Sequence, residues 1–325
     1  MLHYNIFLKN FWESQEDEFA YVKYQEHFST EEPCNIYLVG IRPRVVIDPS
    51  FFEIQEDTIK LKFLIQNKFS FEDAYVFLRL NRKIEGQFEI ETSFPFSRFN
   101  FKDDKGYFYE IEQEGKLMRK GFKGKSFYAL RNLLTEYDTR INDLELLYIG
   151  KSLKMDKSIS PVKRLKNHSN VQRILQKCTQ EYSDKEVYII LCSFVKKISL
   201  LTLSDKLGKF KNHDDMMGKL NKNFQDLKAN NELTTQIAEA ALIDHFDTKE
   251  FNKDFIGTFG NKSHTYYPNI KKSEISTVSV ELDLTELCRV FSKSVKPSAY
   301  HIIKFFPKHD FKKVNDTSFD ESEMW

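Results

Sequence analysis

The stretch LYIGKSLKMDKSISPVKRLKNH, residues 147–168, decides how the rest of the chain is interpreted. It reads as the end of a β-strand, a polar loop and a helix that starts after Ser160, because serine is a good N-cap and a proline in the first helical turn loses no needed donor. On this helix Arg164 and His168 leave the same face, about 5 to 6 Å apart at Cβ, so both can reach one phosphate. Gly150 would allow a tight or positive-φ turn after Tyr148. Taken alone, these residues are better explained as unrelated surface side chains.

A second segment, NNELTTQIAEAALIDHFDTKEFN at 230–252, favours a shared site. It predicts a helix in which Leu242, Ile243 and Phe246 lie on the same face as Glu239, at three, four and seven positions after it. A carboxylate on an apolar face is costly unless it pairs with a cation or holds a metal. Glu239 therefore calls for a partner, although exposure at the edge of the apolar stripe is the simpler alternative.

Composition describes an ordinary soluble protein that can bury a sizeable core. The chain has 325 residues and a hydrophobic fraction of 41%. Its N-terminus lacks the pattern of a signal peptide and its longest apolar run is too short to cross a bilayer, so we expect a cytoplasmic protein without membrane contact. The four cysteines, Cys34, Cys178, Cys192 and Cys288, form no CxxC pair. This spacing indicates reduced, mostly buried thiols in place of disulfides or a zinc site.

Charge is distributed unevenly along the chain. Residues 1–112 have 13 Lys and Arg against 20 Asp and Glu, a net charge of −7, and residues 113–230 have 24 against 13, a net charge of +11. A basic segment is the usual electrostatic footprint of a polyanion partner, and a solvated lysine-rich surface is its bland alternative. The acidic N-terminal part argues against broad phosphate contact there and favours a protein partner or a homo-oligomer.

The pattern of apolar residues changes near residue 115. Before it, segments such as CNIYLVG, RPRVVIDP, TIKLKFLIQ, AYVFLRL and GQFEIETSF predict strands. After it, we expect strands at SFYAL (126–130), LELLYIG (144–150) and VYIILCSF (187–194), and helices at 161–177 and 230–249. The predicted domains are a β-rich recognition or partner-binding domain at 1–115, an α+β domain at 116–260 with an insertion near 196–228, and a C-terminal extension at 261–325.

The polar residues of the second domain resemble those of the GIY-YIG nuclease superfamily, and its restriction-endonuclease-like members in particular. The resemblance covers roughly residues 122–256. It consists of Tyr128 in the first strand, the YIG tripeptide Tyr148, Ile149 and Gly150, the helix pair Arg164 and His168, Glu239, and Asn252 thirteen residues later. The first tripeptide is Ser-Phe-Tyr and not Gly-Ile-Tyr, and Tyr137, at a more usual spacing, lies in TEYDTR, which reads as a loop. The resemblance implies a small three-stranded sheet flanked by helices.

The resemblance also implies a role for each residue. Glu239 would hold one divalent cation, Mg²⁺ or alternatively Mn²⁺, and Arg164 would bind the scissile phosphate. Tyr128, or else Tyr148, would activate water with help from His168, because a free phenol with a pKa near 10 is a poor base at neutral pH. Lys151 would add positive charge beside the phosphate, and Asn252 would orient the end of the glutamate helix.

These inferences predict a metal-dependent endonuclease that cuts double-stranded DNA in restriction or anti-phage defence. Two alternatives remain: a nucleic-acid-binding or assembly protein that keeps the fold without turnover, and an RNA-directed nuclease. The sequence does not specify the target site, the oligomeric state or the partner.

Overall fold

The computed structural model divides the chain into two compact units. Unit 1 contains Met1–Gly40, Leu144–Ile174 and Tyr188–Trp325, and unit 2 contains Ile41–Asp143 and Leu175–Val187. These limits differ from the domain boundaries predicted at residues 115 and 260, because the chain leaves unit 1 after Gly40 and returns to it at Leu144. The structure describes residues 2–15, 28–29, 32–80, 82–108, 110–113, 116–119, 134–152, 165, 168–200, 218, 222, 225, 230–255, 257–272, 275–307 and 312–314.

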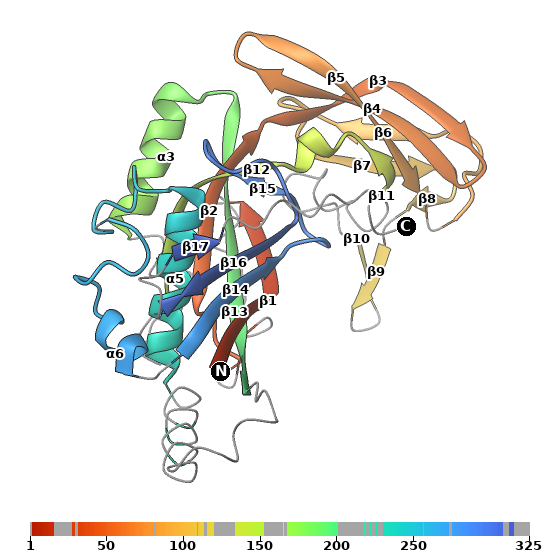
Figure 1. Ribbon diagram of the computed structural model, residues 1–325. Helices are drawn as coiled ribbons and strands as arrows, with labels where there is room; N and C mark the ends of the chain where they lie inside the picture. Colours follow the sequence, from red (N-terminus) through yellow and green to blue (C-terminus); the bar gives the residue numbers. More distant parts are fainter. Residues whose placement is uncertain are drawn as a thin grey trace. The chain divides into compact units, whose positions relative to one another are not determined.

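Unit 1 is built on an eight-stranded sheet with the order β15-β12-β2-β13-β1-β14-β16-β17 (Figure 1). The bounds of these strands, in chain order, are β1 Leu2–Gln15, β2 Ile36–Pro43, β12 Leu144–Lys151, β13 Lys185–Leu200, β14 Ile275–Asp283, β15 Val290–Phe291, β16 Tyr300–Phe306 and β17 Lys312–Val314. β1 pairs with β13 antiparallel and with β14 parallel. β2 lies between β12 and β13, so the strand that carries Tyr148 is next to a strand from the N-terminal part of the chain.

β2 and β13, which are neighbours within the described sheet, each contain a run that is buried on both faces. Residues 36–42 of β2 are all buried, and so are residues 188–193 of β13. A continuous buried run of this kind is typical of a strand that is covered on both sides. The strands predicted at 144–150 and 187–194 are confirmed as parts of β12 and β13.

Three helices accompany the described parts of the chain: α3 (Ser169–Glu181), α5 (Asn231–Phe246) and α6 (Tyr267–Lys272). α5 packs against β12, β14 and β16, and Figure 1 shows it lying along the sheet. The side chain of Asn230 caps α5 by accepting a hydrogen bond from the Leu233 amide at 2.9 Å. The apolar stripe predicted for this helix is confirmed, since Leu242, Ile243 and Phe246 are buried.

The expected small three-stranded sheet flanked by helices is wrong. β1 and the strands β14, β16 and β17 extend the sheet well beyond β12, β2 and β13. The described residues are mainly β-strand. These additional segments lie in the predicted N-terminal domain and C-terminal extension, although ISTVSVELD at Ile275–Asp283 has the alternation and β-branched content of a strand.

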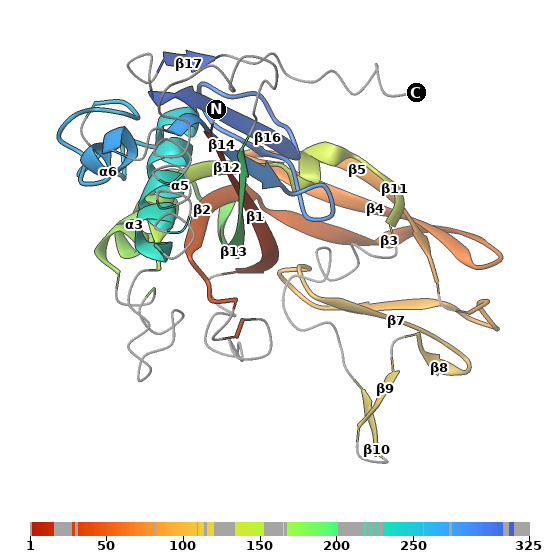
Figure 2. The ribbon, with the colours of Figure 1, turned by 60° about the horizontal axis from the view of Figure 1, so that its bottom comes forward.

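Unit 2 consists mainly of antiparallel strands. β11 (Leu134–Tyr137), β5 (Ser70–Arg79), β4 (Thr58–Asn67) and β3 (Val45–Gln55) form one sheet in that order, and β6 (Glu89–Thr92), β7 (Phe99–Asp103) and β8 (Gly106–Tyr107) form a second (Figure 2). A further hairpin joins β9 (Glu110–Gln113) to β10 (Lys116–Arg119), and a short 3-10 helix covers Thr139–Asn142. The five strands predicted between residues 34 and 94 are confirmed as β2 to β6, with shifted ends.

The core of unit 2 lies between its two sheets. β4 contributes Ile59, Leu61, Phe63 and Ile65, which alternate with partly exposed residues and are all buried. The ring of Phe63 meets that of Phe99 in β7 at a centroid distance of 5.7 Å. A strand with one apolar and one polar face predicts this one-sided packing.

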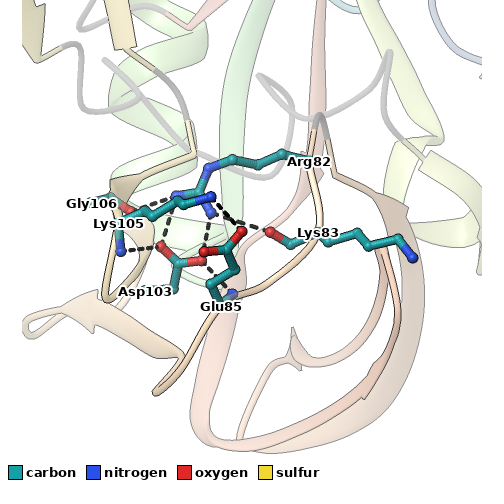
Figure 3. Close-up of polar contacts among 6 residues, drawn as sticks. All are labelled: Arg82, Lys83, Glu85, Asp103, Lys105 and Gly106. Carbon is teal, nitrogen blue, oxygen red and sulfur yellow. Dashed lines mark hydrogen bonds and ion pairs between the residues drawn. The ribbon is translucent and has the colours of Figure 1, made fainter.

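An ion pair between partly exposed Arg82 and buried Asp103 holds the loop that follows β5 (Figure 3). The guanidinium of Arg82 donates hydrogen bonds to both carboxylate oxygens of Asp103, and its Nη2 also donates to the carbonyl of Gly106 at 3.0 Å. Asp103 accepts two more hydrogen bonds, from the amides of Glu85 at 2.7 Å and Lys105 at 2.9 Å. These contacts, led by that of Arg82, hold the pKa of Asp103 well below its usual range.

Two expectations drawn from composition can be compared with the structure. All four cysteines are free and buried, as predicted. Within the part of the chain that is described, no helix is long and apolar enough to cross a membrane.

Candidate functional site

Three aromatic rings meet beside the end of β12. The rings of Tyr148 and His168 have a centroid distance of 5.7 Å, and Tyr37 of β2 lies 5.8 Å from Tyr148 and 6.1 Å from His168. Both tyrosines are buried, whereas His168 is partly exposed. β2 and β12 are neighbours in the sheet, and His168 immediately precedes α3. Two strands and the start of a helix therefore fix the three rings relative to one another.

Gly150 allows Tyr37 to approach β12 closely. A Cβ atom added to Gly150 would lie 2.3 Å from Cζ and 2.4 Å from Oη of Tyr37. Gly150 lies within β12 and is absent from the glycines with positive φ. The positive-φ turn expected at Gly150 is therefore wrong, and the glycine is required by the neighbouring phenol.

Glu239 reaches the same strand from α5. Its Oε1 accepts a hydrogen bond from the amide of Lys151 at 3.1 Å, and its Oε2 lies 3.4 Å from the Lys151 ammonium nitrogen. The side chain of Glu239 is 19% exposed, against 39% for Lys151. Burial raises the pKa of the Glu239 carboxyl above its ordinary value, and Lys151 opposes that rise. The partner that the sequence required for this carboxylate is thus, in part, Lys151.

Asn252 joins the segment after α5 to β12. Its side-chain oxygen accepts hydrogen bonds from the Ile149 amide at 3.2 Å and the Thr248 hydroxyl at 2.9 Å, and its side-chain nitrogen donates to the Ile149 carbonyl at 2.6 Å. All three groups are buried. β15 pairs with β12 only at Leu144 and Glu145. Asn252 and Glu239 therefore satisfy backbone groups of β12 beyond the end of that pairing.

The structure places six of the residues that the sequence singled out on β12 or in contact with it: Tyr148, Gly150, Lys151, His168, Glu239 and Asn252. Tyr128 and Arg164 lie outside the described residues, so their roles stay predictions. The same holds for the strand expected at 126–130, the helix start at Pro161 and most of the insertion near 196–228. The continuous helix predicted at 161–177 is wrong, because His168 is not helical and α3 begins at Ser169. Tyr137, the alternative first tyrosine, lies in β11 and packs against the core of unit 2.

Tyr37 is the residue that sequence reasoning missed. It is the last residue of Asn35-Ile36-Tyr37, which is closer to Gly-Ile-Tyr than Ser-Phe-Tyr is, and it lies in a strand that is apolar on both faces. Both signals were available in the sequence. Consecutive strands commonly pair, so the sequence favours a first tyrosine closer to Tyr148.

A divalent metal at this site would have few protein ligands among the described residues. No group of three or more His, Cys, Asp or Glu that could hold a metal is found among them. Mg²⁺ is commonly held through one or two carboxylates, with substrate phosphates and waters as its other ligands. Glu239 could supply one such carboxylate, and the chemistry of this donor fits that ion.

Comparison of the chain with models of known protein families, with curated proteins and with solved structures gives no match.

Proposed function

We propose that this chain is a metal-dependent endonuclease that hydrolyses phosphodiester bonds in double-stranded DNA, in the setting of restriction or anti-phage defence. The observation that carries the proposal is the convergence of Tyr37, Tyr148 and His168 beside β12, the strand whose Lys151 amide binds the carboxylate of Glu239. These residues come from distant parts of the sequence and include the polar types that phosphodiester hydrolysis needs. The residue resemblance to GIY-YIG nucleases belongs to the same proposal.

Two tyrosines and a histidine can prepare a water for attack. A phenol is a weak base at neutral pH, so it needs a neighbour that accepts or shares its proton. Tyr37 and Tyr148 each lie in ring contact with His168, which is the most exposed of the three. We assign the base to Tyr37, because the hydroxyl of this phenol is held over Gly150, the residue just before Lys151.

The other residues would bind and orient the substrate. Glu239 would hold the divalent metal, which when bound would polarise a phosphodiester oxygen and stabilise the leaving oxygen. Lys151 supplies a cation beside that carboxylate. Arg164 is proposed to bind the scissile phosphate through bidentate hydrogen bonds from its planar guanidinium. Asn252 fixes the position of Ile149, two residues before Lys151, through paired hydrogen bonds. It acts as a positioning residue.

The test is cleavage of plasmid DNA by the full chain in Mg²⁺ or Mn²⁺, with EDTA as the blank. We expect cutting by the wild type and none by Glu239→Gln, which removes the charge but keeps the shape of the side chain. Glu232→Gln is the matched control, because Glu232 lies on the same helix and is exposed. Both variants should retain the wild-type circular dichroism spectrum.

The possible results separate the candidate functions. Equal cutting by the wild type and Glu239→Gln would remove Glu239 from the mechanism. Cleavage of structured RNA but not of duplex DNA would favour the RNA-directed alternative. The ion pair between Glu239 and Lys151 would equally suit a binding protein without turnover, and salt-sensitive DNA binding with no cleavage in either metal would support that function.

Unit 2 is proposed to contact a protein partner or a second copy of the chain. Phe69, in the turn between β4 and β5, is fully exposed at 102%, and Phe94, in the turn between β6 and β7, is 86% exposed. Burial of these two rings at a protein contact would be favourable, because large apolar side chains gain free energy when they leave water. Sedimentation velocity should show a self-associating chain that becomes monomeric when both residues are changed to serine. A wild-type sedimentation coefficient that does not change with concentration would exclude self-association. Contact with a protein partner would then be the remaining proposal for unit 2.

A further inference from the structure

The contact between Lys151 and Glu239 has a consequence for the entry of a metal. The Lys151 ammonium lies 3.4 Å from one carboxylate oxygen, and the Lys151 amide occupies the other oxygen at 3.1 Å. A divalent cation that binds this carboxylate would meet the ammonium at close range. Like charges a few ångströms apart repel strongly in a partly buried site. Glu239 therefore cannot bind the ammonium and the metal together with the full affinity that it has for each alone.

Lys151 is able to move away. Its side chain is 39% exposed, about twice the exposed fraction of Glu239, and a lysine ammonium is a point charge on a flexible stem. The carboxylate is held more firmly because it projects from α5, whose other faces are largely buried. Of the two partners, the lysine is therefore the one that can exchange.

A displaced ammonium needs a new anion. The nearby anion that the proposed function supplies is a phosphate of the nucleic acid, which would also bind the metal. The Lys151 ammonium and the metal would then each bind a phosphate oxygen. The Glu239 carboxylate would bind the metal alone. Metal and nucleic acid would favour each other's binding, as linkage requires of any such exchange.

We propose that Lys151 is an exchangeable cation: it occupies Glu239 in the absence of metal and moves to a phosphate of the nucleic acid when a divalent cation takes its place. This inference rests on the proposed function, and it adds a regulation of metal loading that the residue assignments alone do not contain. The enzyme would hold metal weakly until nucleic acid is present.

The first experiment measures Mn²⁺ affinity without nucleic acid, by electron paramagnetic resonance titration of the full chain. Lys151→Met should bind Mn²⁺ at least about fivefold more tightly than the wild type, the lower end of common coupling factors. Lys151→Gln gives a second neutral variant in case methionine impairs folding. Lys293→Met is the matched control, because Lys293 pairs with Glu250 at 3.5 Å in a more exposed position, and its Mn²⁺ affinity should equal that of the wild type.

The second experiment measures duplex DNA affinity by fluorescence anisotropy in Ca²⁺ and in EDTA, with Ca²⁺ used as an oxygen-seeking probe. Lys151→Met should bind DNA about fivefold more weakly than the wild type in Ca²⁺ and equally well in EDTA, because the ammonium reaches phosphate only when metal is bound. An ordinary docking lysine would lower the affinity in both solutions, and this result would overturn the inference.

The titration also separates the two proposals. Unchanged Mn²⁺ affinity in both Lys151 variants, together with loss of Mn²⁺ binding in Glu239→Gln, would overturn the exchange and leave the metal site of the proposed function. Unchanged Mn²⁺ binding in Glu239→Gln would remove that metal site and the exchange with it.

Discussion

The phenol of Tyr37 occupies the space that a side chain at position 150 would need. A Cβ atom on Gly150 would lie 2.3 Å from Cζ of Tyr37, a separation that real Cβ atoms do not adopt. The tyrosine of one strand and the glycine of its neighbour are therefore complementary, although 113 positions separate them in the sequence. The packing of Tyr37 therefore explains why the third residue of Tyr148-Ile149-Gly150 is glycine.

Gly150→Ala should displace Tyr37 and destabilise unit 1. Adding a methyl group to a filled core commonly costs about 1 to 3 kcal/mol, and here the methyl would meet a buried ring. Urea unfolding followed by circular dichroism would measure the loss. Gly218→Ala is the control, because a Cβ atom at position 218 meets nothing within 4 Å and alanine is the better helix former. Equal stability of the two variants would contradict the close packing of Tyr37 on Gly150.

The choice among the tyrosines can be made by removing one hydroxyl at a time. Tyr37→Phe should lower the cleavage rate at least about a hundredfold, the usual scale for loss of a general base, while DNA affinity changes little. Tyr148→Phe should cost less, because this phenol would help to hold its neighbours. Tyr128→Phe tests the residue that the sequence favoured. A large loss there, with normal cutting by Tyr37→Phe, would return the role of base to Tyr128.

The sequence predicts local structure in this protein better than it predicts which strands become neighbours. Alternating apolar residues correctly indicated β3, β4 and β5, and the apolar face of α5 followed from its spacing. The pairing of β2 with β12 could not be obtained in this way, because the chain builds most of unit 2 between them. Neighbouring strands usually come from nearby segments of the sequence. This expectation predicts that the strand beside Tyr148 carries Tyr128, and not Tyr37.

The candidate site shows the same limit. Glu239 was identified because a carboxylate on an apolar helix face needs a partner, and that reasoning depends only on local spacing. The identity of the partner, Lys151, depends on how α5 meets β12, which no local pattern contains. Asn252 likewise acts on Ile149 through contacts that only the folded chain creates.

Arg164 should act on the rate of cleavage more than on binding. If its guanidinium meets charge that develops in the transition state, Arg164→Ala should lower the rate by about a hundredfold or more at nearly constant DNA affinity. Arg164→Lys should not restore the rate fully, because lysine lacks the bidentate fork. Single-turnover kinetics with a DNA duplex would give both quantities. Weaker binding at an unchanged rate would make Arg164 a docking residue.

Asn252→Asp should weaken the link between α5 and β12. The substitution keeps the shape of the side chain but replaces the nitrogen that donates to the Ile149 carbonyl at 2.6 Å by an oxygen that cannot donate when ionised. A buried carbonyl left without its donor costs about 1 to 3 kcal/mol. Hydrogen exchange should show faster opening of peptides that contain Ile149. The control is Asn261→Asp, since the Asn261 side-chain oxygen accepts from the amide and hydroxyl of Ser263 at an exposed turn. Equal protection from hydrogen exchange in the wild type and Asn252→Asp would show that the hydrogen bonds between Asn252 and Ile149 contribute no stability.

The stability of unit 2 should depend on pH through Asp103. The pKa of this carboxyl is lowered in the folded protein, chiefly by its hydrogen bonds from Arg82, whereas an unfolded aspartate titrates near 3.9. A group with a depressed folded pKa contributes stability that is fully present above the unfolded pKa and is lost as the pH falls through it toward the folded pKa. The contribution of Asp103 should therefore be constant at neutral pH and decline below about pH 5.

Asp103→Asn would isolate this contribution, because asparagine has the same shape and no charge. The substitution would remove the carboxylate that accepts two hydrogen bonds from Arg82, so we expect unit 2 to lose roughly 2 to 4 kcal/mol of unfolding free energy at pH 7. In urea unfolding, the difference from the wild type should shrink as the pH falls from about 5 to 3. Asp57→Asn is the matched control: Asp57 pairs with Arg79 at 3.2 Å in an exposed position, where an ion pair contributes little at any pH. A difference between the wild type and Asp103→Asn that stays constant over this range would show that the Asp103 carboxylate contributes through packing and not through its charge.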